Sequence, residues 1–267
     1  MSTPSPTTTL PAALRRYLTA IADGDPDEAI RHTSHDVESA LPPSPAEPET
    51  APRRRISGRP YLRDALASAY GDSGLTVLLA AGGGDRWFVE GQLDADPAET
   101  VVASFTVDGE AITRQLAFRC PLVARPPAPR APSGGHDGLH AVERYFEHLE
   151  RAEMSAAVEC FSPDTLYSHP PYKHAPEEGR AEFRGRAELL AGFERRGYRT
   201  VHHELLASAQ LGPHVLVEGS TDDAPGGGSF ISSVTLDPEG RIERYVALFT
   251  QPRVPFDYGT TTAFVSE

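Results

Sequence analysis

The chain has 267 residues, a formal net charge of −13 and 24% charged side chains, a composition typical of a globular protein with about two ordinary domains. The negative charge argues against a nucleic-acid-binding protein, because phosphate contacts need a basic face. The two cysteines, Cys120 and Cys160, form no motif and fit a reducing compartment. The N-terminus lacks a secretory pattern and no segment approaches the ~20 apolar residues of a membrane span, so we expect a cytoplasmic protein without membrane or nucleic-acid partners.

Two long segments of the chain repeat each other. The sequence RRYLTAIADGDPDEAI at 15–30 matches ERYFEHLERAEMSAAV at 143–158. This match aligns Tyr17 with Tyr145 at a separation of 128 positions (145 − 17), and the tripeptide VEG recurs at the same separation. A register maintained over such a length predicts a tandem duplication.

The duplication gives the expected domain boundaries. We expect a flexible N-terminus over 1–10, a first domain over 11–123, a Pro/Gly-rich linker over 124–138, a second domain over 139–253 and a C-terminal tail over 254–267. The linker is long enough for the two domains to pack as an intramolecular pseudo-dimer, and the sequence leaves a further homodimer open.

Within the second copy, helices come first and strands follow. Apolar spacing and alternation predict, in chain order, helices over 139–149 and 156–161, a strand over 165–169, a helix over 185–195, and strands over 200–208, 214–221, 229–237 and 241–250. The DPEGR turn joins the last two strands as a hairpin. This order is typical of an α+β domain.

Three stretches of the second copy carry a family resemblance. The runs RYFEHLERAEMSAAVECFSPDTLYSHP, FRGRAEL and LDPEGRIERY resemble the nuclear transport factor 2-like superfamily, which includes ketosteroid isomerases and SnoaL-like polyketide cyclases. The resemblance extends over nearly the whole of both copies. It implies two tandem cone-shaped α+β domains, each with three N-terminal helices on a curved, mainly antiparallel sheet. It does not fix the reaction, because the superfamily also contains dehydratases, epoxide hydrolases and binding members.

The ketosteroid isomerase branch suggests positions for the chemistry. In that branch, a tyrosine of the first helix and a late acid form an oxyanion site, and an aspartate base precedes a proline. By position these residues fall on Tyr145, on about Ser232 and on His169. The first copy has Tyr17, about Ala103 and Leu41 at these positions. The resemblance therefore implies a degenerate first domain and an active second domain.

His169 is the leading candidate for acid/base chemistry. An imidazole has an unperturbed pKa near 6.5, so it can accept and return a proton at neutral pH. Alternation of the strand puts Thr165, Tyr167 and His169 on one face, which we expect to be concave. A histidine that is merely hydrogen-bonded at the mouth of the domain is the alternative. Tyr145 is either an oxyanion donor or a packed core tyrosine.

Two further residues could assist His169. On the strand that contains His202 and His203, only one imidazole can face the cavity, and alternation favours His203. Glu218 could orient a histidine as a supporting carboxylate. A structural salt bridge explains Glu218 as well, because Glu90 occupies its place in the first copy.

The remaining candidates would line the cavity and bind substrate. They are Tyr167, Tyr172, His174, Phe193, Leu216, Tyr245 and Phe249. His169, His174 and His203 with Glu218 would be an adequate ligand set for zinc or iron, but their spacing matches no established metal motif. We therefore expect no metal and no cofactor.

The sequence thus predicts a cofactor-independent acid/base enzyme of isomerase, cyclase, dehydratase or epoxide-hydrolase type. Its substrate would be a small, largely apolar carbonyl or polyketide-like molecule bound in the second domain. One alternative is a non-catalytic small-molecule-binding or dimerisation module, and another is a metal-dependent hydrolase.

Overall fold

The computed structural model describes residues 9–44, 47–49, 51–71, 73–94, 99–123, 137–171, 179–197, 201–222 and 226–256, and the backbone of 263–265. The chain forms two compact units. Within the described ranges, the first contains residues 9–123 and 254–256, and the second contains 137–253 and 263–265. Tyr172 and His174 lie outside the described residues. Among the helices of these ranges, none combines the length and the apolar character needed to cross a membrane.

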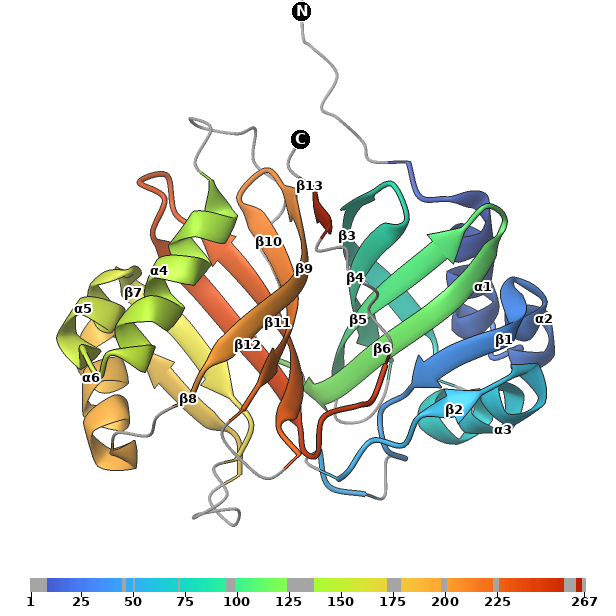
Figure 1. The fold of residues 1–267 in the computed structure, drawn as a ribbon, viewed down its shortest axis with the longest axis horizontal. Coiled ribbons are helices and arrows are strands. Elements are labelled where there is room, and N and C mark those ends of the chain that lie inside the picture. Colours follow the sequence, from blue (N-terminus) through green and yellow to red (C-terminus); the bar gives the residue numbers. More distant parts are fainter. Residues whose placement is uncertain are drawn as a thin grey trace, which may run out of the picture. The chain divides into compact units, whose positions relative to one another are not determined.

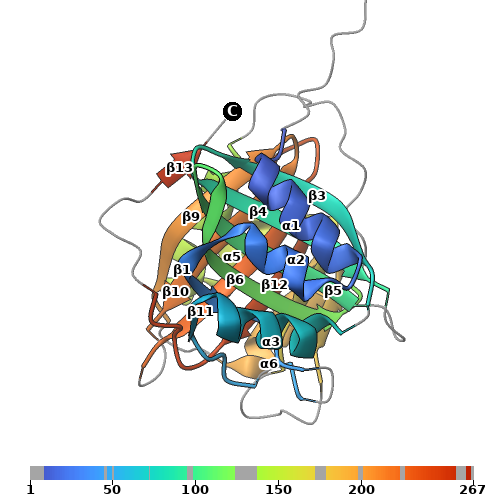
Figure 2. The ribbon, with the colours of Figure 1, turned by 90° about the vertical axis from the view of Figure 1, so that its right-hand side faces the viewer.

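The first domain places three helices on one face of a six-stranded sheet (Figure 2). Its elements are α1 (Ala12–Ala22), α2 (Pro26–Arg31), β1 (Thr33–Ala40), β2 (Ile56–Ser57), α3 (Arg59–Tyr70), β3 (Leu75–Gly83), β4 (Arg86–Leu93), β5 (Glu99–Asp108) and β6 (Ala111–Pro121). The strand order is β2-β1-β6-β5-β4-β3. Strands β1 and β6 are parallel, and the other neighbours are antiparallel.

The second domain repeats this plan (Figure 1). Its elements are α4 (Gly138–Glu150), α5 (Met154–Glu159), β7 (Phe161–His169), β8 (Ala181–Arg184), α6 (Gly185–Arg196), β9 (His203–Leu211), β10 (His214–Thr221), β11 (Gly228–Leu236), β12 (Ile242–Thr250) and β13 (Ala263–Val265). The strand order is β13-β9-β10-β11-β12-β7-β8. The predicted α+β class is confirmed, and each sheet is mixed because β7 and β12, like β1 and β6, run parallel.

The strand registers of the two sheets correspond residue by residue. In the first domain Ser39 pairs with Gln115, and in the second Tyr167 pairs with Tyr245. Such agreement in strand order and register is what a tandem duplication produces. The side chains that differ between the copies therefore occupy equivalent places in the two domains.

The ends of the second domain differ from the expected linker and tail. Helix α4 already starts at Gly138, where the Asp137 carboxylate accepts a hydrogen bond from the His140 N–H at 3.2 Å. After β12, Phe256 lies under the guanidinium of Arg114 at 5.1 Å, and both residues belong to the first unit. Strand β13 then pairs in parallel with β9 of the second sheet.

Candidate functional site

His169 ends β7 and has a partly buried side chain. Its Nδ1–H donates to the carbonyl oxygen of Pro170 at 2.7 Å, so the neutral ring has its lone pair on Nε2. Removal from water lowers the pKa of His169 to about 3, against the effect of this hydrogen bond. The guanidinium charges of Arg196 and Arg180 lower it further. The imidazole is therefore neutral at physiological pH.

Tyr167 connects His169 to the interior of the second domain. The two rings are nearly parallel, with centroids 6.3 Å apart and an interplanar angle of 5°. On the other side, the Tyr167 ring stacks at 5.2 Å on Tyr245 of the neighbouring strand. The Tyr145 hydroxyl donates to the Tyr167 hydroxyl at 3.3 Å, which joins α4 to this row of rings.

The phenols of this row keep their protons at neutral pH. Burial raises the pKa of Tyr167 to about 12, and it also raises the pKa values of Tyr145 and Tyr245. Ser232 lies on the same face of the sheet, where its hydroxyl donates to the Tyr245 hydroxyl at 2.9 Å. A buried, protonated phenol can donate a hydrogen bond to an oxygen on which negative charge develops.

His203 faces the same interior from β9. Its ring stacks on Phe146 at 4.2 Å, and its side chain is 14% exposed. The Glu150 carboxylate accepts a hydrogen bond from the His203 N–H at 2.7 Å and lies 3.3 Å from its Nδ1. Glu150 also lies 3.2 Å from the His202 ring, which points to solvent and is 66% exposed.

Glu150 is thus a residue of this site that the sequence analysis missed. Partial burial raises its pKa, but the hydrogen bonds from His203 and His202 outweigh burial, so the pKa of this carboxyl lies below its usual value. The orienting role expected of Glu218 is therefore available to Glu150.

Glu218 and Leu216 lie apart from these groups. On β10, Val215 and Val217 belong to the core cluster beneath the helices, so the alternate residues Leu216 and Glu218 lie on the opposite face of the sheet. Both are fully buried there. The geometry does not bring Glu218 together with His169 or His203.

The other predicted lining residues occupy the helix-side interior. Phe193 of α6 is fully buried, 5.6 Å from the Tyr167 ring and 6.4 Å from the Tyr145 ring. Phe249 is half-buried and packs against the same core. The guanidinium of Arg196 lies 5.5 Å over the Phe193 ring, so a positive charge borders the aromatic cluster.

The proposed metal ligands do not form a cluster in the part of the chain that the structure describes. Within those residues, no three His, Cys, Asp or Glu side chains are placed to hold a metal ion. Glu218 lies on the other face of the sheet from His203. His174 lies outside the described residues.

The equivalent interior of the first domain has different chemistry. Leu41 stands at the position of His169, and it belongs to the first domain's core cluster. Gln115 stands at the position of Tyr245, where its Oε1 accepts a hydrogen bond from Tyr17 at 2.5 Å. Ala103 stands at the position of Ser232, since the two residues have the same place in the strand registers.

Comparison with known families agrees with this architecture. The model of the SnoaL-like domain matches residues 142–249, from α4 to β12. The second domain therefore matches the SnoaL-like domain. The first domain repeats its strand order and register, so the chain is a tandem pair of α+β domains.

Similar solved structures are distant in sequence. A nuclear transport factor 2-like protein of unknown function from Burkholderia xenovorans LB400 is 20% identical, covers 43% of this chain and 85% of its own, and has a TM-score of 0.35. A protein with a ketosteroid isomerase-like fold from Catenulispora acidiphila DSM 44928, in complex with trimethylamine, is 16% identical. It covers 41% of this chain and 86% of its own, and has a TM-score of 0.34. An LEH-like epoxide hydrolase from M. tuberculosis is 18% identical, covers 42% of this chain and 81% of its own, and has a TM-score of 0.34. Comparison with curated proteins gave no match.

Proposed function

We propose that the second domain is an acid/base catalyst that moves a proton α to the carbonyl group of a small, largely apolar substrate. The observation that carries this proposal is the neutral imidazole of His169 beside a row of buried, protonated phenols. An isomerase or cyclase of polyketide-like substrates is the finer class that we favour.

The proposed step uses only side chains of this chain. The Nε2 lone pair of His169 takes the proton from the α-carbon, and the C–H bonding electrons form an enolate whose negative charge lies mainly on oxygen. The Tyr167 hydroxyl donates to that oxygen, and Tyr145 supports it by donating to Tyr167. The imidazolium then returns its proton to carbon or oxygen. The low pKa of His169 favours this return but disfavours the first transfer, so the enolate charge that develops beside the ring must stabilise the imidazolium.

The aromatic core of the second domain supports an apolar substrate. Buried rings, among them Phe161, Phe193 and Phe230, pack beneath the helices, so a substrate that reaches His169 would contact aromatic surfaces. Aromatic faces bind flat, apolar molecules with little loss of conformational freedom. His203, held by Glu150, would assist from the neighbouring strand.

Deuterium exchange tests the proposal without knowledge of the natural substrate. We expect the protein to accelerate exchange of the α-protons of 2-tetralone in D₂O, followed by proton NMR. His169→Leu should lower the rate by about 10²–10⁴-fold, the usual contribution of a general base. The matched first-domain variant Leu41→Val should keep the wild-type rate.

The pH dependence gives a second criterion. Because the pKa of His169 is about 3, the rate should be nearly flat from about pH 5 to 8, where an unperturbed histidine would show a limb near 6.5. Saturable binding of 2-tetralone with no exchange above background would favour the non-catalytic binding module instead.

A further inference from the structure

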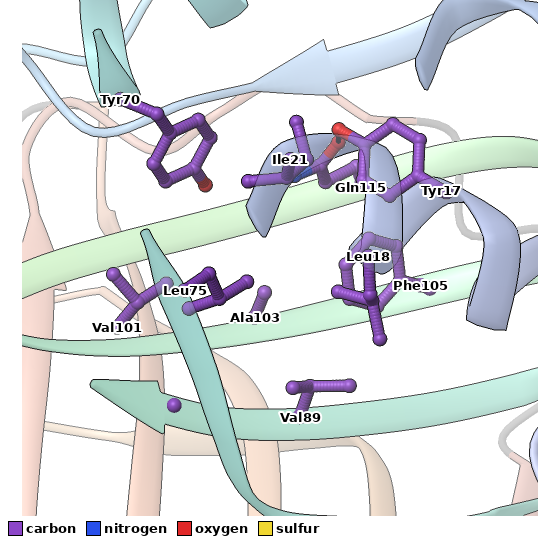
Figure 3. Close-up of a pocket in the computed structure, with 11 residues that line it drawn as sticks. Tyr17, Leu18, Ile21, Tyr70, Leu75, Val89, Val101, Ala103, Phe105 and Gln115 are labelled. Carbon is purple, nitrogen blue, oxygen red and sulfur yellow. Dashed lines mark hydrogen bonds between the residues drawn. The ribbon is translucent and has the colours of Figure 1, made fainter. Parts of the chain in front are cut away.

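A small pocket lies inside the first domain, between α1 and the sheet (Figure 3). Its lining is apolar except for Tyr17, Tyr70 and Gln115. The space free of protein atoms, counted out to the mouth, is about 300 Å³, and about 10 Å³ of it admits the centre of a water molecule. This is room for about one ordered water, and a larger occupant needs the pocket to widen.

The polar groups of this pocket are not all satisfied. Tyr17 donates to Gln115 Oε1, but within the described residues neither Gln115 Nε2 nor the Tyr70 hydroxyl has a hydrogen-bond partner. Both side chains are buried, with 1% and 6% of their surface exposed. Ser39 pairs with Gln115 in the sheet but does not line the pocket, and its buried Oγ also has no partner among the described residues.

Unpaired buried polar groups are rare in native proteins and usually indicate an ordered water or a ligand. The Tyr70 ring lies across the pocket from the Tyr17–Gln115 pair, and its hydroxyl points into the space between them (Figure 3). Burial raises the pKa of Tyr70, against the effect of Arg119 and Arg53, so the phenol keeps its proton. The amide and the phenol therefore present donors to one space, and an oxygen acceptor would satisfy both.

The second domain fills the equivalent space with larger side chains. At three positions set by the strand registers, Leu75, Val101 and Gln115 of the first domain correspond to His203, Phe230 and Tyr245 of the second. The pocket thus results from the smaller residues of the first copy. Leu75 is half-buried on the edge strand β3, so this lining side chain is the one that a larger occupant would have to displace toward solvent.

We propose that the first domain binds a small, mostly apolar molecule that carries one carbonyl oxygen. The oxygen accepts hydrogen bonds from the Tyr70 hydroxyl and Gln115 Nε2, and the apolar body packs against Leu18 and Ile21 of α1. The site contains no proton acceptor equivalent to His169, so it binds without catalysis. It lies in the other domain from the proposed reaction, and neither proposal depends on the other.

Fluorine NMR titration tests this site with two ligands of nearly the same shape. The probes are 4-fluoroacetophenone and 1-ethyl-4-fluorobenzene, which lacks the acceptor oxygen. We expect the ketone to bind about 5-fold or more tightly than the hydrocarbon, because one neutral hydrogen bond contributes about that factor. Tyr70→Phe should remove this preference. It deletes only the hydroxyl and should leave the fold intact.

Two more variants locate the bound probe. Val101→Phe introduces the residue that the second domain has at this position, so it should fill the pocket and abolish the ketone preference that depends on Tyr70. His169→Leu, in the other domain, should leave this Tyr70-dependent preference unchanged. A melting curve for each variant shows that it is folded.

Three results would overturn the proposal. The first is no saturable binding of either probe, with an ordered water alone between Tyr70 and Gln115 in a high-resolution structure. The second is a ketone preference that persists in Tyr70→Phe. The third is a ketone preference that survives Val101→Phe but disappears in His169→Leu, which would assign the preference to the second domain.

Discussion

Replacing His169 with leucine, the residue at the equivalent position 41 of the first copy, should make the second domain less sensitive to acid. Burial lowers the pKa of His169 from 6.5 to about 3 in the folded state. As the pH falls below 6.5, the unfolded chain takes up a proton that the folded protein resists. The free energy of unfolding therefore decreases between about pH 6.5 and 3, and His169→Leu removes this contribution.

The size of the effect follows from the shift. Each pH unit between the two pKa values costs about 1.4 kcal/mol, which gives an upper limit of about 3 kcal/mol between about pH 6.5 and 4.5. His169 is only partly buried, so solvent screening reduces the expected difference to about 1–2 kcal/mol. The lowered pKa of Glu150 also favours unfolding in acid, but it is common to both proteins and cancels in their difference.

Urea unfolding at about pH 7 and about pH 4.5 measures this difference. Trp87 is the single tryptophan and lies in the first domain, so its fluorescence follows that domain while circular dichroism follows both. Between about pH 7 and about pH 4.5 the unfolding free energy of the second domain should fall by about 1–2 kcal/mol more in the wild type than in His169→Leu. The transition of the second domain is the one seen by circular dichroism and not by fluorescence. His140→Gln, which changes a 64% exposed histidine, should behave as the wild type. Equal acid losses in wild type and His169→Leu would refute a neutral, desolvated imidazole.

Three other changes have defined outcomes. Tyr167→Phe should lower the rate of 2-tetralone exchange by about 10²-fold or more, as loss of an oxyanion donor usually does, with little change in ligand affinity. Glu150→Ala should lower the unfolding free energy of the second domain by about 1–3 kcal/mol in urea titrations, because the His203 N–H loses its carboxylate, and Glu150→Gln should cost less because its amide oxygen still accepts. Gly219→Ala should lower the melting temperature, since a Cβ there would lie 2.5 Å from the Glu204 carbonyl oxygen, and such overpacking costs about 1–3 kcal/mol. A melting temperature equal to that of the wild type would contradict this last prediction.

The order of the elements follows from local patterns, and for that reason the sequence predicts it. Helical spacing locates α4 and α6, and alternation locates β10, β11 and β12. The short strands β8 and β13 are missed because four and three residues carry too little alternation. Parallel pairing of β7 with β12 is also missed, since it joins segments about 80 residues apart, and no local pattern reports such a contact.

Local patterns also predict some residues of the candidate site and miss others. Alternation correctly places Tyr167 and His203 on faces that contact the core, because neighbouring apolar residues indicate the same faces. It does not say which face of β10 lies under the helices, since that strand is buried on both sides, and alternation alone therefore cannot place Glu218. The contact between Glu150 and His203 spans 53 positions and depends on the docking of α4, which the sequence pattern does not contain.

The two copies show how one backbone supports different chemistry. In both, a tyrosine hydroxyl of the first helix makes a buried hydrogen bond to the sheet, but the partner lies on β6 in the first copy and on β7 in the second, and these are not equivalent strands. In the second copy the partner is Tyr167, next to an imidazole, and the neighbouring positions carry rings that fill the interior. In the first copy the partner is Gln115, the imidazole position is Leu41, and the smaller neighbours leave a hollow with unused donors. Since the register is the same, the proposed difference between proton transfer in the second domain and simple binding in the first depends on these few side chains and not on the architecture.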